Sequence, residues 1–93
     1  MLMALILAVT TVRGTAEAAK FKRDVLMPPK CYVNGAIKKR KEKLKNGGFK
    51  LVRDCIIDHI IPLRCGGPDV EANMQWQTYS ESLVKDKTER LCK

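Results

Sequence analysis

The chain contains a single histidine, His59, and an aspartate, Asp58, precedes it directly. A neutral imidazole can take a proton from water near physiological pH, which is the step that a hydrolytic general base performs. A glycine pair and an amide, Asn73, follow in the same stretch, DHIIPLRCGGPDVEANMQWQ. Adjacent residues of a regular strand point to opposite faces, so Asp58 and His59 can converge only where the chain bends.

The elements that would position these residues run in the order strand, loop, strand, helix. Residues 49–61, FKLVRDCIIDHII, are rich in branched side chains and predict a strand or a pair of strands that carries His59. Proline and glycine residues in 62–68 predict a loop, and NMQWQT predicts a short extended piece with Trp76 in the core. A helical pattern follows, with Ser80 as its cap and with Leu83, Val84 and Leu91 as buried candidates.

The N-terminal half is basic and has fewer apolar positions. An arm that begins at Ala19 is broken at Pro28-Pro29. A helical pattern then predicts a basic helix from Asn34, as N-cap, through AIKKRKEKLK, with Ile37 and Leu44 on one face. Gly47-Gly48 would end this helix.

Size and charge limit the class of protein. The chain has 93 residues, 18 Lys+Arg against 10 Asp+Glu, and a formal net charge of +8. A chain of this length forms one small domain with a thin core, which usually needs disulfides, a metal or a partner for stability. The positive balance favours an anionic partner, with nucleic acid first and a membrane surface second.

The first eighteen residues have the pattern of a signal peptide. The apolar run MLMALILAV is too short to span a membrane, and Ala16-Glu17-Ala18 fits the small-x-small cleavage rule. Cleavage would leave a mature chain from Ala19, secreted or periplasmic, with no stable membrane insertion and with an unchanged net charge, because Arg13 and Glu17 are both removed. The alternative is an apolar N-terminal helix packed on the domain.

The four cysteines form an even set without a CxxC pair, which favours two disulfides over a structural zinc site. Sequence does not decide among the three possible pairings. We favour Cys31–Cys55, which would tie the N-terminal arm to the strand before the histidine, and Cys65–Cys92, which would tie the loop to the last helix. If the signal-peptide interpretation fails, four reduced cysteines in a cytoplasmic protein become the better interpretation.

The pattern DHIIPL…GG…N.Q, with MQWQT and KDKTE, resembles the HNH endonuclease family and in particular its small exported bacterial members. The resemblance covers residues 56–90. It implies an α+β fold built on a ββα-metal finger in residues 49–93, after the signal peptide in 1–18 and a basic N-terminal arm or helix in 19–48.

The resemblance also implies roles for single residues. His59 would be the general base, Asp58 a ligand of a divalent metal, and Asn73 the residue that holds the loop and orients the histidine. Mg²⁺ is the expected ion, with Mn²⁺, Zn²⁺ or Ni²⁺ as other options. The third motif position, usually His or Asn, is Ser82, a poor ligand. Either Asp58, the substrate phosphate and water hold the ion, or the site is weakened.

The expected function is metal-dependent cleavage of DNA, or of RNA, with little sequence preference. One alternative is a non-catalytic basic nucleic-acid-binding module on a degenerate finger, and another is a disulfide-stapled cationic peptide that acts on membranes. Asp69 and Glu71 are expected to be solvated loop charges, and the sequence indicates no protein partner. The expected phosphate contacts are Lys38, Lys39, Arg40, Lys85, Lys87 and Arg90.

Overall fold

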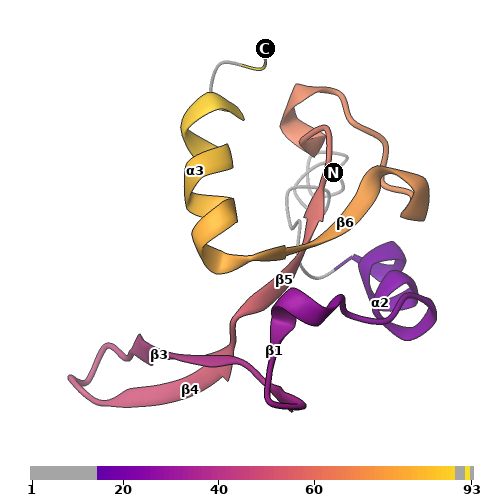
Figure 1. Ribbon diagram of the computed structural model, residues 1–93. Coiled ribbons are helices and arrows are strands. Elements are labelled where there is room, and N and C mark those ends of the chain that lie inside the picture. The colour runs from indigo at the N-terminus through magenta and orange to yellow at the C-terminus, as the bar shows by residue number, and fades with distance from the viewer. Residues whose placement is uncertain (1–14, 90–91, 93) are drawn as a thin grey trace.

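The computed structural model describes residues 15–89 and residue 92. Within these residues, three two-stranded antiparallel hairpins lie between an N-terminal and a C-terminal helix (Figure 1). The coarse α+β class is therefore confirmed. The elements are α2 (Ala16–Asp24), β1 (Tyr32–Val33), β2 (Ala36–Ile37), β3 (Lys39–Lys43), β4 (Phe49–Arg53), β5 (Cys55–His59), β6 (Met74–Thr78) and α3 (Tyr79–Glu89), with single 3-10 turns at Pro29–Cys31, Leu63–Cys65 and Glu71–Asn73.

The β5–β6 hairpin is the centre of the fold, and α2 and α3 lie on its two sides (Figure 1). Its register pairs Ile57 with Trp76 and His59 with Met74. Because side chains alternate along a strand, these residues share one face, which packs against α2. The predicted order of strand, loop, strand and helix is confirmed in this part of the chain.

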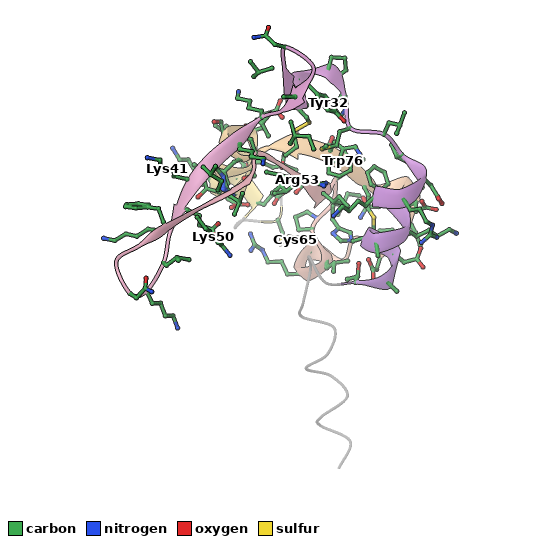
Figure 2. The ribbon with its side chains drawn as sticks, turned by 90° about the horizontal axis from the view of Figure 1, so that it is seen from below. Tyr32, Lys41, Lys50, Arg53, Cys65 and Trp76 are labelled. Atoms are coloured by element: carbon green, nitrogen blue, oxygen red, sulfur yellow. A yellow bond between two sulfur atoms is a disulfide. The ribbon has the colours of Figure 1, made fainter. Side chains whose placement is uncertain are left out.

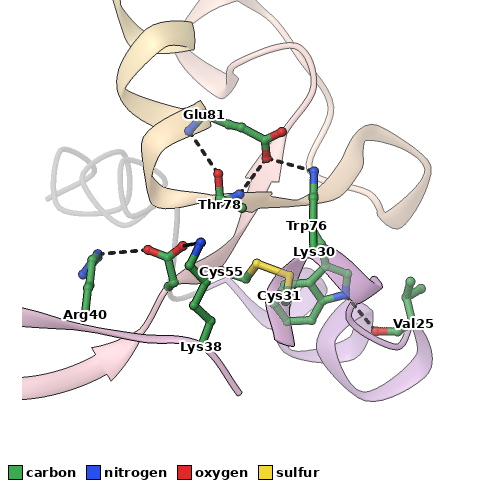
Figure 3. The surroundings of a disulfide bond; sticks show 10 residues. Val25, Lys30, Cys31, Lys38, Arg40, Cys55, Trp76, Thr78 and Glu81 are labelled. Carbon is green, nitrogen blue, oxygen red and sulfur yellow. Dashed lines mark hydrogen bonds and ion pairs between the residues drawn. A yellow bond between two sulfur atoms is a disulfide. The ribbon is translucent and has the colours of Figure 1, made fainter. Parts of the chain in front are cut away.

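The core is small and lies between α2 and the β5–β6 hairpin. Phe21 and Ala18, three residues apart on one face of α2, are buried against it, and the rings of Phe21 and Trp76 are 6.0 Å apart. Trp76 also donates a hydrogen bond from Nε1 to the carbonyl of Val25 at 2.9 Å, which satisfies its only polar atom (Figure 3). The prediction that Trp76 belongs to the core is confirmed.

Helix α2 contains the site at which the signal peptide would be cleaved. Thr15 caps the helix by accepting a hydrogen bond from the backbone of Ala18 at 2.9 Å, and Ala18 is 4% exposed. Cleavage after Ala18 would remove this cap and this core contact, and it remains a prediction. Residues 1–14 lie outside the described part of the chain. Among the described residues, no helix is long and apolar enough to cross a membrane.

Both predicted disulfides are present. Cys31–Cys55, with Cα atoms 5.7 Å apart, joins the turn after α2 to the first residue of β5 and is part of the core (Figure 3). Cys65–Cys92, with Cα atoms 5.3 Å apart, joins the loop after β5 to the chain beyond α3. Each bridge therefore ties a segment outside the central hairpin to the part of the chain that carries His59.

The predicted helix from Asn34 through residue 45 is wrong, because this segment forms β1, β2 and β3. Asn34 and Gly35 have φ values of 51° and 81°, the left-handed values of a tight hairpin turn, and the second Asn-Gly pair forms part of the β3–β4 turn, with Gly47 at 89°. Ile37 and Leu44 provide too little apolar surface to hold a helix on the core. The basic residues therefore lie on a hairpin, and the N-terminal helix is α2.

Helix α3 begins one residue earlier than predicted and buries a different face. Thr78 and Glu81 form a capping box: Glu81 Oε1 accepts from the Thr78 backbone at 2.8 Å, and Thr78 Oγ1 accepts from the Glu81 backbone at 3.2 Å. Ser80 is not the cap. Leu83 and Val84 are 47% and 66% exposed, contrary to prediction, and Leu91 lies outside the described residues.

We predict that replacing Cys31 and Cys55 together by alanine lowers the free energy of unfolding more than replacing Cys65 and Cys92. The two bridges close similar loops, with sequence separations of 24 and 27, and a disulfide typically contributes ~2–4 kcal/mol. Cys31 is 1% exposed, so the first pair also loses core packing. Denaturant unfolding of the two double variants measures which one loses more stability. A larger loss of unfolding free energy for the Cys65 and Cys92 variant would contradict this prediction.

The contacts of Glu81 predict that part of the free energy of unfolding is lost at acidic pH. Hydrogen bonds, from Lys30 Nζ first and from the Thr78 backbone second, hold the pKa of Glu81 below its usual value of 4.5. A carboxyl with a lowered pKa stabilises the fold above its unfolded pKa, and this contribution is lost as pH falls through the folded pKa. We expect Glu81→Gln to be less stable than wild type at neutral pH, and to lose less stability on acidification.

The measurement is the denaturation midpoint at neutral pH and at about pH 3, below the ordinary range of carboxyl groups. Asp86→Asn, on the exposed side of the same helix, is the matched control and should follow wild type. If Glu81→Gln loses as much stability between neutral pH and about pH 3 as wild type does, the Lys30 and Thr78 contacts do not contribute this pH dependence.

Candidate functional site

His59 is the last residue of β5 and is buried, with 3% of its surface exposed. Its Nε2 lies 2.9 Å from Oδ1 of Asp69. An ionised carboxylate can only accept, so Nε2 is the donor and Nδ1 retains the lone pair of the neutral ring. Nδ1 is buried and has no hydrogen-bond partner among the described residues. One nitrogen is therefore held by a carboxylate while the other can accept a proton.

Asp69 was expected to be a solvated loop charge, and the structure places it on the histidine instead. Its side chain remains 39% exposed, so it connects the buried ring to the surface. The neighbouring Glu71 also has a partner, because it pairs with Lys20 of α2 at 3.5 Å. The loop between β5 and β6 is thus held against the α2 side of the hairpin.

Asn73 fixes the two ends of this loop to each other. Its Oδ1 accepts from the backbone of Ile61 at 3.0 Å, while its Nδ2 donates to the carbonyls of Ile61 and Pro68, both at 2.9 Å. At Gly67 a Cβ atom would overlap the carbonyl oxygen of Ile61, so only glycine allows this close approach. These contacts agree with the loop-holding role that the sequence resemblance implies for Asn73, and they place the loop that carries Asp69.

Asp58 lies on the opposite face of β5 from His59, because β5 is regular through both residues. Its Oδ2 accepts from Gln75 Nε2 at 3.0 Å and lies 3.1 Å from Lys85 Nζ. The predicted convergence of Asp58 and His59 therefore does not occur within the described arrangement. The ammonium group of Lys85 takes the place beside Asp58 that a metal ion was expected to occupy.

Lys85 contacts Asp58 through its carboxylate and His59 through its backbone carbonyl. Its Nζ donates to the backbone carbonyl of His59 at 3.0 Å and also pairs with Glu89, one turn later in α3. A surface hollow of about 370 Å³ adjoins Lys85, between the chain after β5 and the end of α3. Lys85 was expected only as a phosphate contact, and the structure gives it two carboxylate partners as well.

Ser82 does not reach Asp58 in this arrangement. It is 6% exposed, and its Oγ donates to the carbonyl of Tyr79 at 2.6 Å, within its own helix. A larger ligand such as histidine would have to enter a packed position, so restoring the usual family residue there would disturb α3. Glu81, the residue before Ser82, accepts hydrogen bonds in the capping box and is therefore also occupied.

The described residues do not fit a divalent metal in the predicted place. The carboxylates of Asp58 and Glu89 share the ammonium group of Lys85, and no group of three His, Cys, Asp or Glu side chains in the described part of the chain could hold an ion. Hard cations such as Mg²⁺ need several oxygen ligands. A metal could bind Asp58 only after the ammonium group of Lys85 had left, so the metal remains a prediction without a formed site.

The residues expected to contact phosphate differ in what they touch. Lys38 and Arg40, both labelled in Figure 3, approach the buried carboxylate of Asp54 at 3.9 and 4.0 Å. Lys39 and Lys87 are exposed, and Arg90 lies outside the described residues. Asp54 therefore holds two of the six candidates at the base of the β3–β4 hairpin.

Comparisons with known proteins return nothing that identifies this chain: no family model matches it, and no curated protein or solved structure gives a significant match. The function must therefore be argued from the residues of the chain itself, from the His59–Asp69 pair, the loop that Asn73 holds, and the Asp58–Lys85 pair.

The Asp58–Lys85 pair predicts how a metal would bind. Lys85→Met leaves the carboxylates of Asp58 and Glu89 without their shared cation in a place where the side chains are about four-fifths covered or more, so the variant should be less stable by about 1–3 kcal/mol. Millimolar Mg²⁺ or Mn²⁺ should then raise the melting temperature of Lys85→Met more than that of wild type. Asp58→Asn/Lys85→Met, which lacks the carboxylate of Asp58, is the control and should not respond. An equal response of wild type and Lys85→Met would show that a metal binds without displacing Lys85.

Proposed function

We propose that this chain hydrolyses phosphodiester bonds of nucleic acid, with DNA as the preferred substrate, and that His59 is the general base. The observation that carries the proposal is the buried imidazole with Nε2 on Asp69 at 2.9 Å and Nδ1 without a partner in the described residues. A base oriented by a carboxylate is a recurring arrangement in hydrolytic sites. The resemblance of DHIIPL…GG…N.Q to the HNH endonucleases supports the same chemistry.

In this proposal Nδ1 of His59 takes a proton from the attacking water, whose oxygen forms a bond to phosphorus as the bond from phosphorus to a sugar oxygen breaks. The sugar oxygen leaves with the electron pair of that bond and takes a proton from solvent. Asp69 is a positioning residue: it holds the ring in the tautomer that leaves Nδ1 basic, and it stabilises the positive charge that the ring acquires. Asn73 and Gly67 act one step further away, since they fix the loop that carries Asp69. Because His59 is buried, substrate and water must reach the ring by movement of this loop.

In this proposal Lys85 binds a phosphate of the nucleic acid on the α3 side of the hairpin, a neighbour of the phosphate that reacts at His59 on the α2 side. Its ammonium group borders the surface hollow and contacts the backbone of His59 at 3.0 Å. A phosphate oxygen that enters the hollow can exchange with the carboxylate of Asp58 for this cation, and the mobile lysine side chain permits the exchange. No step of the proposal depends on a metal ion.

The two disulfides support a site of action in an oxidising compartment, where such bridges persist. Together with the apolar N-terminal run and its small-x-small site, they support export of the chain. Cytoplasmic folding with reduced cysteines would leave the thin core without either staple.

A second candidate function is nucleic-acid binding without catalysis. The observation that favours it is the burial of His59 at 3% exposure, together with the neutralisation of Asp58 by Lys85. Both features keep the site closed to substrate. Neither prevents the exposed lysine and arginine side chains from binding nucleic acid. The two functions differ in one outcome, which is whether a covalent bond of the nucleic acid is broken.

We predict that the purified oxidised chain cleaves supercoiled plasmid and that His59→Gln cleaves it ~10²–10⁴-fold more slowly. Asp69→Asn should lower kcat and leave KM nearly unchanged, because it acts through the ring and not through substrate binding. Asp86→Asn is the matched control and should cleave at the wild-type rate. Each variant is assayed with EDTA and with Mg²⁺ or Mn²⁺.

Melting temperature and DNA affinity are measured on the same samples, since His59 is buried and a loss of fold would also abolish cleavage. Wild-type activity in a folded His59→Gln variant would remove the base assignment. A wild-type chain that binds DNA and cleaves under none of the metal conditions would establish the binding module instead.

A further inference from the structure

The β3–β4 hairpin extends away from the rest of the chain, and Figure 2 shows Lys41 and Lys50 on its two sides. Its register pairs Lys39 with Arg53, Lys41 with Leu51 and Lys43 with Phe49. Directly paired residues of an antiparallel hairpin project from the same face. These six residues therefore form one face, which we call the outer ribbon face: Lys39, Lys41, Lys43, Phe49, Leu51 and Arg53.

The opposite face of the hairpin carries its acidic contacts. Glu42 approaches Arg40 at 3.8 Å and Lys50 at 3.9 Å. Arg40 also lies over the ring of Tyr79, 3.8 Å from its centre, and reaches the buried Asp54. Both cations of this face thus have carboxylate partners, and Arg40 joins the hairpin to the first residue of α3.

The outer ribbon face is exposed and has one sign of charge. All six of its side chains are exposed, and none of its four cations pairs with a carboxylate in the described part of the chain. Phe49 and Leu51 are 61% and 63% exposed beside these cations. Lysines alone could serve to keep the edge of a hairpin from pairing with another chain. An exposed phenylalanine on the same face works against that purpose, because it adds apolar surface.

We propose that the outer ribbon face binds single-stranded DNA, with the phosphates on the four cations and an unpaired base on Phe49. Alternate residues of a strand lie about 7 Å apart, so Lys39, Lys41 and Lys43 form a row of cations that can follow a phosphate backbone. An aromatic ring beside such a row is the arrangement that binds unpaired bases, whose faces stack on it whatever the sequence. In a duplex these faces are covered by neighbouring bases.

This inference deepens the proposed function, since it names the surface that would hold the nucleic acid, and it rests on nucleic acid being the substrate. It also changes which lysine and arginine side chains of the β3–β4 hairpin are expected to contact phosphate. Lys38 and Arg40 anchor the hairpin through Asp54, while Lys39, Lys41, Lys43 and Arg53 carry the binding.

The test is fluorescence anisotropy of a labelled single-stranded oligonucleotide in EDTA, titrated with the full oxidised chain at several salt concentrations. Replacing Lys39, Lys41 and Lys43 by glutamine should weaken binding and reduce the slope of log Kd against log salt by about 2, given ~0.7 per neutralised phosphate. The matched control removes the same charge from outside the outer ribbon face, with Lys22→Gln, Arg23→Gln and Lys50→Gln, the last on the opposite face of the hairpin, and should bind like wild type. Phe49→Ala should weaken binding about ten-fold or more and leave the salt slope unchanged.

Equal weakening by the triple variant and its control, or wild-type affinity in Phe49→Ala, would overturn the inference. Tighter binding to a duplex of the same length would overturn it as well. So would binding to vesicles with 30% phosphatidylserine that depends on the three lysines while DNA binding does not. Melting temperatures confirm that each variant is folded. If the wild-type chain never cleaves DNA and the triple variant no longer binds it, the outer ribbon face is supported and the nuclease proposal is refuted.

If the triple variant binds normally and still cleaves DNA in a way that requires His59, the nuclease proposal is supported and the outer ribbon face is refuted.

Discussion

The alternation of side chains along β5 is the constraint from which the rest of the site follows. Asp58 and His59 are neighbours in the chain, and a regular strand sends them to opposite faces of the β5–β6 hairpin. His59 is buried on the α2 side and finds Asp69, while Asp58 lies on the α3 side and finds Lys85. Each of these two side chains has one charged partner on its own face, because a buried polar group without a partner is costly. The site is therefore two pairs separated by a hairpin.

The small core explains why so much of the chain is devoted to holding this hairpin. Only a few apolar side chains are buried within the described residues, and a cystine is one of the main elements of the core. The second disulfide, the hydrogen bonds of Asn73 and the capping box of α3 restrain the segments that the core does not reach. The basic hairpin then extends from this base without a contribution to the core, which leaves its outer face available for a charged partner.

The sequence predicts those parts of the structure that depend on local signals. The strand, loop, strand and helix around His59 were predicted correctly. The cysteine pairing that we favoured is also present, although the sequence alone left three pairings open. The lysine-rich segment was predicted as a helix because Ile37 and Leu44 have helical spacing, yet two Asn-Gly pairs at 34–35 and 46–47 are stronger hairpin signals. The partners of His59 and Asp58 could not be predicted in the same way. Asp69 and Lys85 are 10 and 27 residues away, and only the packed loop and helix bring them there.

We infer that Asp69 holds the ring of His59 in the tautomer with hydrogen on Nε2 and a free lone pair on Nδ1. Long-range ¹H–¹⁵N correlation spectra of the chain labelled at histidine report this directly, since the two ring nitrogens have distinct shifts when one is protonated. With one histidine the spectrum has a single assignment. We expect a protonated Nε2 and an unprotonated Nδ1 in the neutral ring, and loss of this preference in Asp69→Ala. A ring protonated at Nδ1, or a tautomer that is unchanged in Asp69→Ala, would contradict the account.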